Sequence, residues 1–88
     1  MKIIVSPRAE KELKKIHAID QIAVVKKIRS LQNSSTSLKK EKLAGYSDIF
    51  RIRAGHYRIV YKERKHDIYV ILIGHRKDIY QLLRHFFD

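Results

Sequence analysis

The feature that most constrains the fold is a run, residues 49–62, in which apolar and polar side chains alternate. Successive side chains of a β-strand point to opposite faces of a sheet, so this period of two predicts two strands, Ile49–Ala54 and Tyr57–Lys62. The connection through Gly55 predicts a tight hairpin, because glycine adopts positive φ without steric cost. One apolar and one polar face per strand indicate a sheet covered by other elements on its apolar side.

Arginines occupy the polar face of this hairpin. If the apolar face meets helices, Arg51, Arg53 and Arg58 emerge together on the opposite face. The segment Ile68–Ile73 is apolar at every position, as expected of a central strand covered on both sides, and Arg76 follows it at the rim of the sheet. A guanidinium group keeps its charge at physiological pH and binds phosphate through two parallel hydrogen bonds. The cluster therefore predicts a site for a polyanion.

The N-terminal third has helical spacing instead. Residues Lys2–Ser6 predict a short strand, and Ser6 followed by Pro7 predicts a helix start. Asp20 is expected to cap a second helix. Apolar side chains recur at helical spacing in both helices: Ala9, Leu13 and Ile16 in the first, and Val24, Ile28 and Leu31, widened by Ile22 and Val25, in the second.

The remaining segments complete the prediction. Asn33–Ser37 predicts a loop, Leu38–Leu43 is a basic connector without assigned structure, and Asp78–Phe87 predicts a short terminal helix. The sequence thus predicts one α+β domain over residues 1–88, in the order β-α-α-β-β-β(-α). Its mainly antiparallel sheet would carry the two N-terminal helices on one face and a concave basic face on the other. Three tyrosines are expected in the core: Tyr57, Tyr61 and Tyr69.

The charge balance narrows the choice of partner. Twenty Lys and Arg against nine Asp and Glu give +11 at pH 7, which favours nucleic acid ahead of an anionic membrane or an acidic protein. The longest apolar run, Ile68–Ile73, is too short to span a bilayer, and the first residues are too few for a secretory signal segment. The chain has no cysteine. We expect a cytoplasmic protein that needs neither a metal ion nor a small-molecule cofactor.

Two motifs resemble those of a known superfamily. The run FRIRAGHYRIVY contains G-x-Y-R-[IL]-V-Y at residues 55–61, and VILIGHRKDIY contains G-H-R-x-x-[IV]-Y at residues 74–80. In a chain this short and basic, they resemble the RelE/ParE superfamily, the toxins of type II toxin–antitoxin pairs, and the RelE branch in particular. The resemblance covers essentially the whole chain and implies a RelE-like fold and a cognate antitoxin as partner.

The resemblance also implies an activity. RelE-type toxins enter the ribosomal A site and cut mRNA there without a metal ion, by attack of the 2′-hydroxyl on the adjacent phosphorus. Tyr80 would stack on or near the scissile nucleotide. The catalytic residues implied are Arg51, Arg53, Arg58, Arg76 and Tyr80. Contacts to RNA are expected from Lys42, Arg51, Arg53, His56, Arg58, Arg76 and Lys77.

One departure from the family concerns the proton acceptor. Well-known members carry lysines at the positions of Arg51 and Arg53, and one of those lysines is assigned the role of general base. A guanidinium cannot readily take that role, because it keeps its proton far above neutral pH. Histidine is the side chain best suited to proton transfer near neutral pH, so His56 and His75 are the candidates, and His75 is preferred because it lies in the second motif.

Two other functions stay open. A ParE-like toxin would poison DNA gyrase with the same fold and no RNA cleavage, although the G-H-R-x-x-x-Y ending and the pair Arg51 and Arg53 argue against it. The third is a non-catalytic RNA- or ribosome-binding module. Lysines outside the motifs, among them Lys26 and Lys27, are expected on solvated faces, where some can follow the rRNA backbone and make ribosome affinity sensitive to salt.

Overall fold

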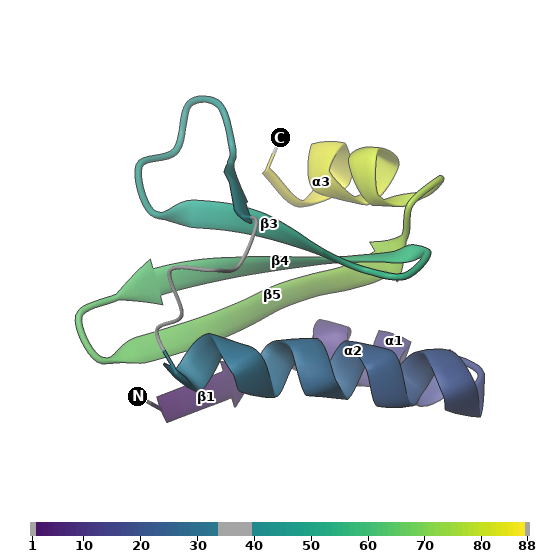
Figure 1. Cartoon of the computed structure of the whole chain (residues 1–88). Helices are drawn as coiled ribbons and strands as arrows, with labels where there is room; N and C mark the ends of the chain where they lie inside the picture. Colours follow the sequence, from purple (N-terminus) through teal and green to yellow (C-terminus); the bar gives the residue numbers. More distant parts are fainter. Residues whose placement is uncertain (1, 34–39, 88) are drawn as a thin grey trace.

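The computed structural model describes residues 2–33 and 40–87, which form one sheet between two layers of helices (Figure 1). The strands lie in the order β1-β5-β4-β3-β2. Strand β1 runs parallel to β5, and the other neighbours are antiparallel. Helices α1 and α2 cover one face and α3 lies on the other. The elements are β1 (Lys2–Val5), α1 (Pro7–Lys15), α2 (Ala18–Ser30), the 3₁₀ turn η1 (Leu31–Asn33), β2 (Lys40–Lys42), β3 (Ile49–Ala54), β4 (Tyr57–Arg64), β5 (Asp67–His75) and α3 (Ile79–Phe87).

The starts of α1 and α2 can be compared with the two helix caps that the sequence predicts. The predicted cap at Ser6 is confirmed: its Oγ accepts the Ala9 N–H at 3.0 Å and donates to the Ile71 carbonyl at 2.7 Å. The predicted cap at Asp20 is wrong. Helix α2 begins at Ala18, so Asp20 lies in its first turn, where a negative charge favours the helix dipole.

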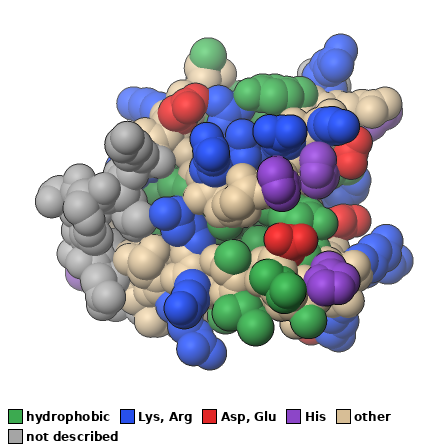
Figure 2. Space-filling model, turned by 45° about the vertical axis from the view of Figure 1, so that its right-hand side comes forward, with side chains coloured by type: hydrophobic (Ala, Val, Ile, Leu, Met, Phe, Trp, Pro, Cys, Tyr) green, Lys and Arg blue, Asp and Glu red, His purple; other side chains and the backbone are tan. Residues whose placement is uncertain are grey.

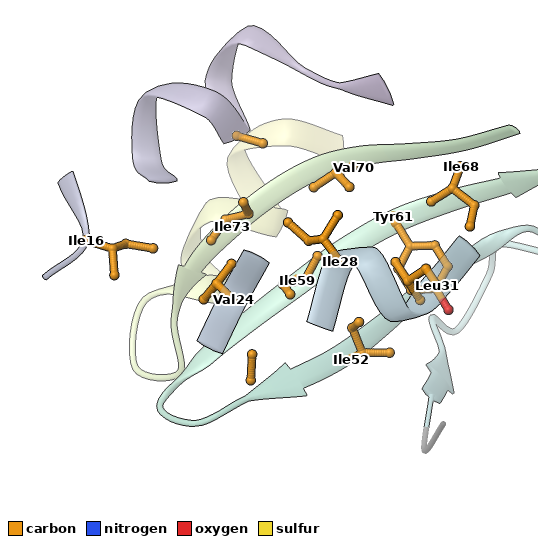
Figure 3. Packing of buried hydrophobic residues seen from close by; sticks show 12 residues of the cluster. Ile16, Val24, Ile28, Leu31, Ile52, Ile59, Tyr61, Ile68, Val70 and Ile73 are labelled. Carbon is orange, nitrogen blue, oxygen red and sulfur yellow. The ribbon is translucent and has the colours of Figure 1, made fainter. Parts of the chain in front are cut away.

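The main core lies between the sheet and the two N-terminal helices. Side chains from α2 and from the sheet point toward one another there (Figure 3). The predicted apolar faces of both helices and of the hairpin are confirmed, with one exception: Ile22 is 61% exposed because it lies on the solvent side of α2. The buried members are Ala9, Ile16, Val24, Ile28, Leu31, Ile52, Ala54, Ile59, Tyr61, Ile68, Val70 and Ile73.

A smaller core lies on the other face, beneath α3. It consists of Ile49, Val60, Leu72 and Ile79. Gly74 makes the close approach of α3 possible, because a Cβ at this residue would lie 2.9 Å from Leu82 Cδ1. The terminal helix is therefore attached near the carboxyl end of β5.

A β-bulge explains how β5 serves both cores. Tyr61 pairs with Val70 and Val60 pairs with Leu72, so Ile71 has no partner in the register. The extra residue shifts the alternation, which places Leu72 under α3 and Ile73 under the N-terminal helices. Before the bulge, Tyr69 points to the face that carries α3, beyond the reach of that helix. Its assignment to the core is therefore wrong, since Tyr69 is 37% exposed.

Strand β2 is an element that the sequence did not predict. It falls within the segment 38–43, for which the sequence predicts no structure. Residues 38–39 of this segment and residues 34–37 of the predicted loop at 33–37 lie outside the described part of the chain. Its residues Lys40, Glu41 and Lys42 are all exposed and carry no apolar pattern. The antiparallel pairing with β3 sets Glu41 opposite Arg51. In the described residues, no helix is long and apolar enough to cross a membrane.

Candidate functional site

The strand register brings two of the predicted arginines into direct contact range. Arg53 of β3 is the Cα partner of Arg58 in β4, and Arg58 is in turn the partner of Gly74 in β5. Directly opposed residues of an antiparallel pair have Cβ atoms about 5 Å apart, and like charges placed there destabilise the sheet. A bound anion between the two guanidinium groups would relieve that repulsion. We call the sheet surface that carries Arg51, Arg53 and Arg58 the arginine face.

Arg51 is fixed more firmly than its neighbours. Its guanidinium forms an ion pair with the Glu41 carboxylate, and its Cζ lies 5.1 Å from the centre of the Tyr80 ring. The Arg51 side chain is only 15% exposed as a result. Strand β2 and helix α3 therefore meet over the arginine face through this one residue.

Tyr80 is 55% exposed although it stands beside Arg51. Its neighbour Ile79 is fully buried and anchors the first turn of α3. The first turn of α3 thus buries Ile79 and leaves the Tyr80 ring exposed beside the Arg51 guanidinium. An exposed aromatic ring next to cations is the arrangement that stacks a nucleobase.

The hairpin end of the sheet holds the remaining predicted groups. The Arg76 N–H donates to the His56 carbonyl at 2.7 Å, which ties the segment after β5 to the hairpin turn. The rings of His56 and His75 are stacked with centroids 6.2 Å apart, and the Tyr57 ring meets His75 edge-on at 5.6 Å. Figure 2 shows this end of the molecule, where Lys and Arg side chains gather in a band and two His side chains lie next to each other.

The hydrogen bonds of His75 bear on its chemistry. Its Nδ1 accepts the Lys77 backbone N–H at 3.2 Å. A neutral imidazole carries one ring proton. Because Nδ1 accepts a hydrogen bond here, that proton is on Nε2 when the ring is neutral. Nε2 then acts as a hydrogen-bond donor, while Nδ1 is occupied by the Lys77 N–H.

One predicted RNA contact is not brought to the arginine face. Lys42 pairs with Phe50 in the register, and Phe50 packs against the main core on the opposite face of the sheet. Residue Lys42 therefore belongs to the side of β2 that faces away from Arg51. Lys77 lies beside His75, close to the site, through its backbone contact.

Glu41 is the functional candidate that sequence reasoning missed. Within the run Lys39 to Lys42 it reads as part of a solvated charged segment, and no spacing separates it from its neighbours. The antiparallel pairing of β2 with β3 alone shows that its carboxylate reaches the arginine face. In residues 2–33 and 40–87, no three His, Asp or Glu side chains come together in a way that could hold a metal ion.

The fold and the arginine face together define a small basic toxin of the RelE/ParE superfamily, in its RelE-like branch. A family model described as the ParE toxin of the type II toxin–antitoxin system parDE matches residues 3–80. The chain belongs to this family. A search of curated proteins gave no match.

Solved structures agree with this assignment. RelE in the RelB–RelE complex from Methanococcus jannaschii is 28% identical, with 90% of this chain and 96% of that chain covered and a TM-score of 0.75. The isolated Escherichia coli RelE toxin is 25% identical, with 99% and 98% covered and a TM-score of 0.72. The intact Escherichia coli RelBE complex gives 28% identity, 84% and 94% coverage and a TM-score of 0.69.

Proposed function

We propose that this chain is a ribosome-dependent endoribonuclease, which cuts mRNA in the A site and is neutralised by a cognate antitoxin. The observation that carries the proposal is the arginine face, where Arg53 opposes Arg58 and Arg51 is held against Tyr80. The similarity to RelE in complexes with RelB supports an antitoxin partner. The substrate would lie with its scissile phosphate on the guanidinium groups and a base on the Tyr80 ring.

The arginine face suits the chemistry of RNA cleavage. The 2′-hydroxyl oxygen attacks the adjacent phosphorus, the bond from phosphorus to the 5′-oxygen breaks, and the products are a 2′,3′-cyclic phosphate and a 5′-hydroxyl. Negative charge grows on the non-bridging oxygens during this step, and fixed cations aimed at them lower the barrier. Arginine is suited to the task because its planar fork binds two phosphate oxygens at once. The ribosome would align the 2′-hydroxyl with the leaving oxygen.

The proton balance of the reaction needs an acceptor and a donor. We assign the acceptor to Glu41, because its carboxylate is the acidic group in contact with the arginine face. It would take the proton of the 2′-hydroxyl when the strand displaces it from Arg51. His75 in its imidazolium form would donate its Nε2 proton to the departing 5′-oxygen, and it would return to the neutral ring whose Nδ1 accepts the Lys77 N–H. His56, the other candidate from the sequence, lies beside it.

A defined ribosome complex tests the activity. Purified protein is mixed with 70S ribosomes that carry mRNA in the A site, and cuts are mapped by primer extension beside free mRNA. We expect a cut within the A-site codon that is absent from free mRNA and from the Arg58→Ala, Arg76→Ala double variant. The matched control, Arg64→Ala with Lys65→Ala, removes the same charge at the opposite end of the hairpin strands and should cut normally. Intact ribosome binding without a cut would contradict the nuclease proposal and indicate a non-catalytic binding module.

The role of Glu41 has its own test in the same assay. As the proton acceptor, Glu41→Gln should lower the single-turnover rate by about 100-fold or more while RNA binding is kept. If Glu41 merely neutralises Arg51, the same substitution should raise both RNA affinity and rate. His75→Ala should lower the rate and remove the limb of the pH profile that belongs to the donor. A loss of a few-fold or less in His75→Ala and in His56→Ala would exclude both histidines from proton transfer.

A second function is favoured by one specific observation. The family model that matches the chain is that of ParE toxins. A ParE-like chain would inhibit DNA gyrase and leave RNA intact. A supercoiling assay with purified gyrase separates the two readings, because inhibition there together with no A-site cut would replace the nuclease by a gyrase poison.

A further inference from the structure

A cationic hollow lies next to the arginine face. It occupies about 380 Å³ between helix α2 and the hairpin turn. It is lined by Lys26 and Lys27 of α2, by Arg53 of β3 and by the small Ala54-Gly55 segment. None of the described residues that line it is acidic. Three cations without an acidic neighbour make the hollow a place for an anion.

The floor of the hollow is the end of β3 and the turn that follows it. In the described part of the chain, β2 pairs with Phe50 to Ile52 of β3, and Arg53 and Ala54 follow beyond this pairing. Gly55 adds no side chain, and a Cβ built on it would meet nothing within 4 Å. The small Ala54-Gly55 segment therefore leaves room for an anion between α2 and the hairpin turn.

Arg53 belongs to both the hollow and the arginine face. It opposes Arg58 across β3 and β4, and it also lines the hollow with the two lysines of α2. The hollow and the arginine face therefore adjoin at Arg53.

We propose that the hollow binds the sugar–phosphate backbone of the mRNA strand that continues out of the arginine face. This inference rests on the proposed function. It names residues outside the two sequence motifs as part of the substrate path. Lys26 and Lys27 would hold flanking phosphates and so position the strand, without contact with the scissile group.

The lining of the hollow favours RNA over an acidic protein segment. A helix that docks in a groove buries large apolar anchors, and this hollow offers only small apolar side chains such as Ala23 and Ala54. The exposed Ile19 and Ile22 lie about one helical turn before Ala23 and Lys26 on the same side of α2, and they do not line the hollow. Phosphate groups need cations and open access, and the hollow provides both.

The test measures RNA binding as a function of salt. The probe is a fluorescent single-stranded 2′-O-methyl oligoribonucleotide, which lacks the attacking hydroxyl and stays intact. We expect Lys26→Gln with Lys27→Gln to reduce the slope of log K against log salt by about 1.4, because each phosphate contact of a single strand contributes about 0.7. Binding at 0.15 M salt should weaken by roughly tenfold. Lys26→Arg with Lys27→Arg should restore the slope.

A matched control removes the same charge elsewhere. Lys2→Gln with Lys65→Gln acts at the opposite end of the sheet, where both residues are exposed. A slope for the Lys26, Lys27 variant equal to that of this control would overturn the proposal. Weaker binding of that variant to poly-L-glutamate, with unchanged RNA binding, would also overturn it and assign the hollow to an acidic protein. Melting followed by circular dichroism verifies that all variants are folded.

The same variants distinguish this inference from the proposed nuclease. If the parent protein cuts A-site mRNA and the Lys26, Lys27 variant binds RNA like the control, the hollow is excluded and the nuclease stands. If the parent protein does not cut and the salt slope still depends on Lys26 and Lys27, the hollow binds RNA in a protein that is no nuclease.

Discussion

Two equally buried isoleucines should respond differently to truncation, because they belong to different cores. Ile59 and Ile79 are both fully shielded from solvent. Ile59 lies on β4 in the main core beneath α1 and α2, whereas Ile79 lies on α3 in the small core on the other face. If α3 can detach while the rest of the fold stays intact, the two substitutions act on different openings of the molecule.

The magnitudes follow from the cavities that alanine would leave. Ile→Ala in a packed interior costs about 2–5 kcal/mol. Ile59 lies on the interior strand β4 within the larger core, so about 4 kcal/mol is expected for Ile59→Ala. Ile79 sits on a terminal helix that can settle, so about 2 kcal/mol is expected for Ile79→Ala. A domain of this size is stable by about 5–15 kcal/mol, so both variants should still fold.

Hydrogen exchange of backbone amides resolves the two openings. Ile79→Ala removes contacts that hold α3 on the sheet, so α3 detaches more readily. Amides of α3 should therefore exchange about thirtyfold faster, which corresponds to about 2 kcal/mol. Ile59 keeps its contacts when α3 detaches. Ile59→Ala should therefore accelerate exchange in β4 and leave exchange in α3 unchanged. Equal acceleration in α3 and β4 by Ile59→Ala would show that α3 opens only with global unfolding, and would refute the reasoning.

Three further predictions concern stability. Burial, with a smaller contribution from Glu63, raises the pKa of Tyr61 from 10.0 to about 12. The folded protein then holds this proton more tightly than the unfolded chain, so its stability is unaffected below pH 10 and falls as the pH rises toward 12, by roughly 2–3 kcal/mol. Urea titrations across this range should show the loss in the parent protein and a smaller one in Tyr61→Phe. Ser6→Ala removes a helix cap and should cost about 1 kcal/mol, or about 4–8 °C in Tm, whereas an unchanged Tm would mean that water replaces the hydroxyl. Gly55 has φ +62°, so Gly55→Ala should cost about 1–2 kcal/mol from backbone strain alone and Gly55→Asn less; equal Tm values for the two variants would contradict that cause.

Much of the fold follows from local rules. The alternation around Arg51 and Arg58 sets which face of the hairpin is buried, and the spacing of Val24 and Ile28 does the same for α2, since both patterns reflect fixed backbone periods. The cap at Ser6 is equally local, because its hydroxyl satisfies an amide three residues away. These features needed no tertiary information.

Long-range pairing decided the rest. The apolar run Ile68–Ile73 looked covered on both faces, but α3 packs only near the carboxyl end of β5, so Tyr69 is exposed. Glu41 looked like a solvated charge and reaches Arg51, because β2 pairs with β3. No sequence pattern encodes a contact whose partners are set by strand order.

The sequence by itself determined the basic hairpin, the buried helix faces and the arginines that share one side of the sheet, because these depend on the backbone period of each element. Strand order and helix docking decide that Arg53 opposes Arg58, that Tyr80 lies against Arg51 and that Lys26 and Arg53 line one hollow. Those relations join segments that are distant along the chain, and they exist only once the strands have paired and α3 has docked.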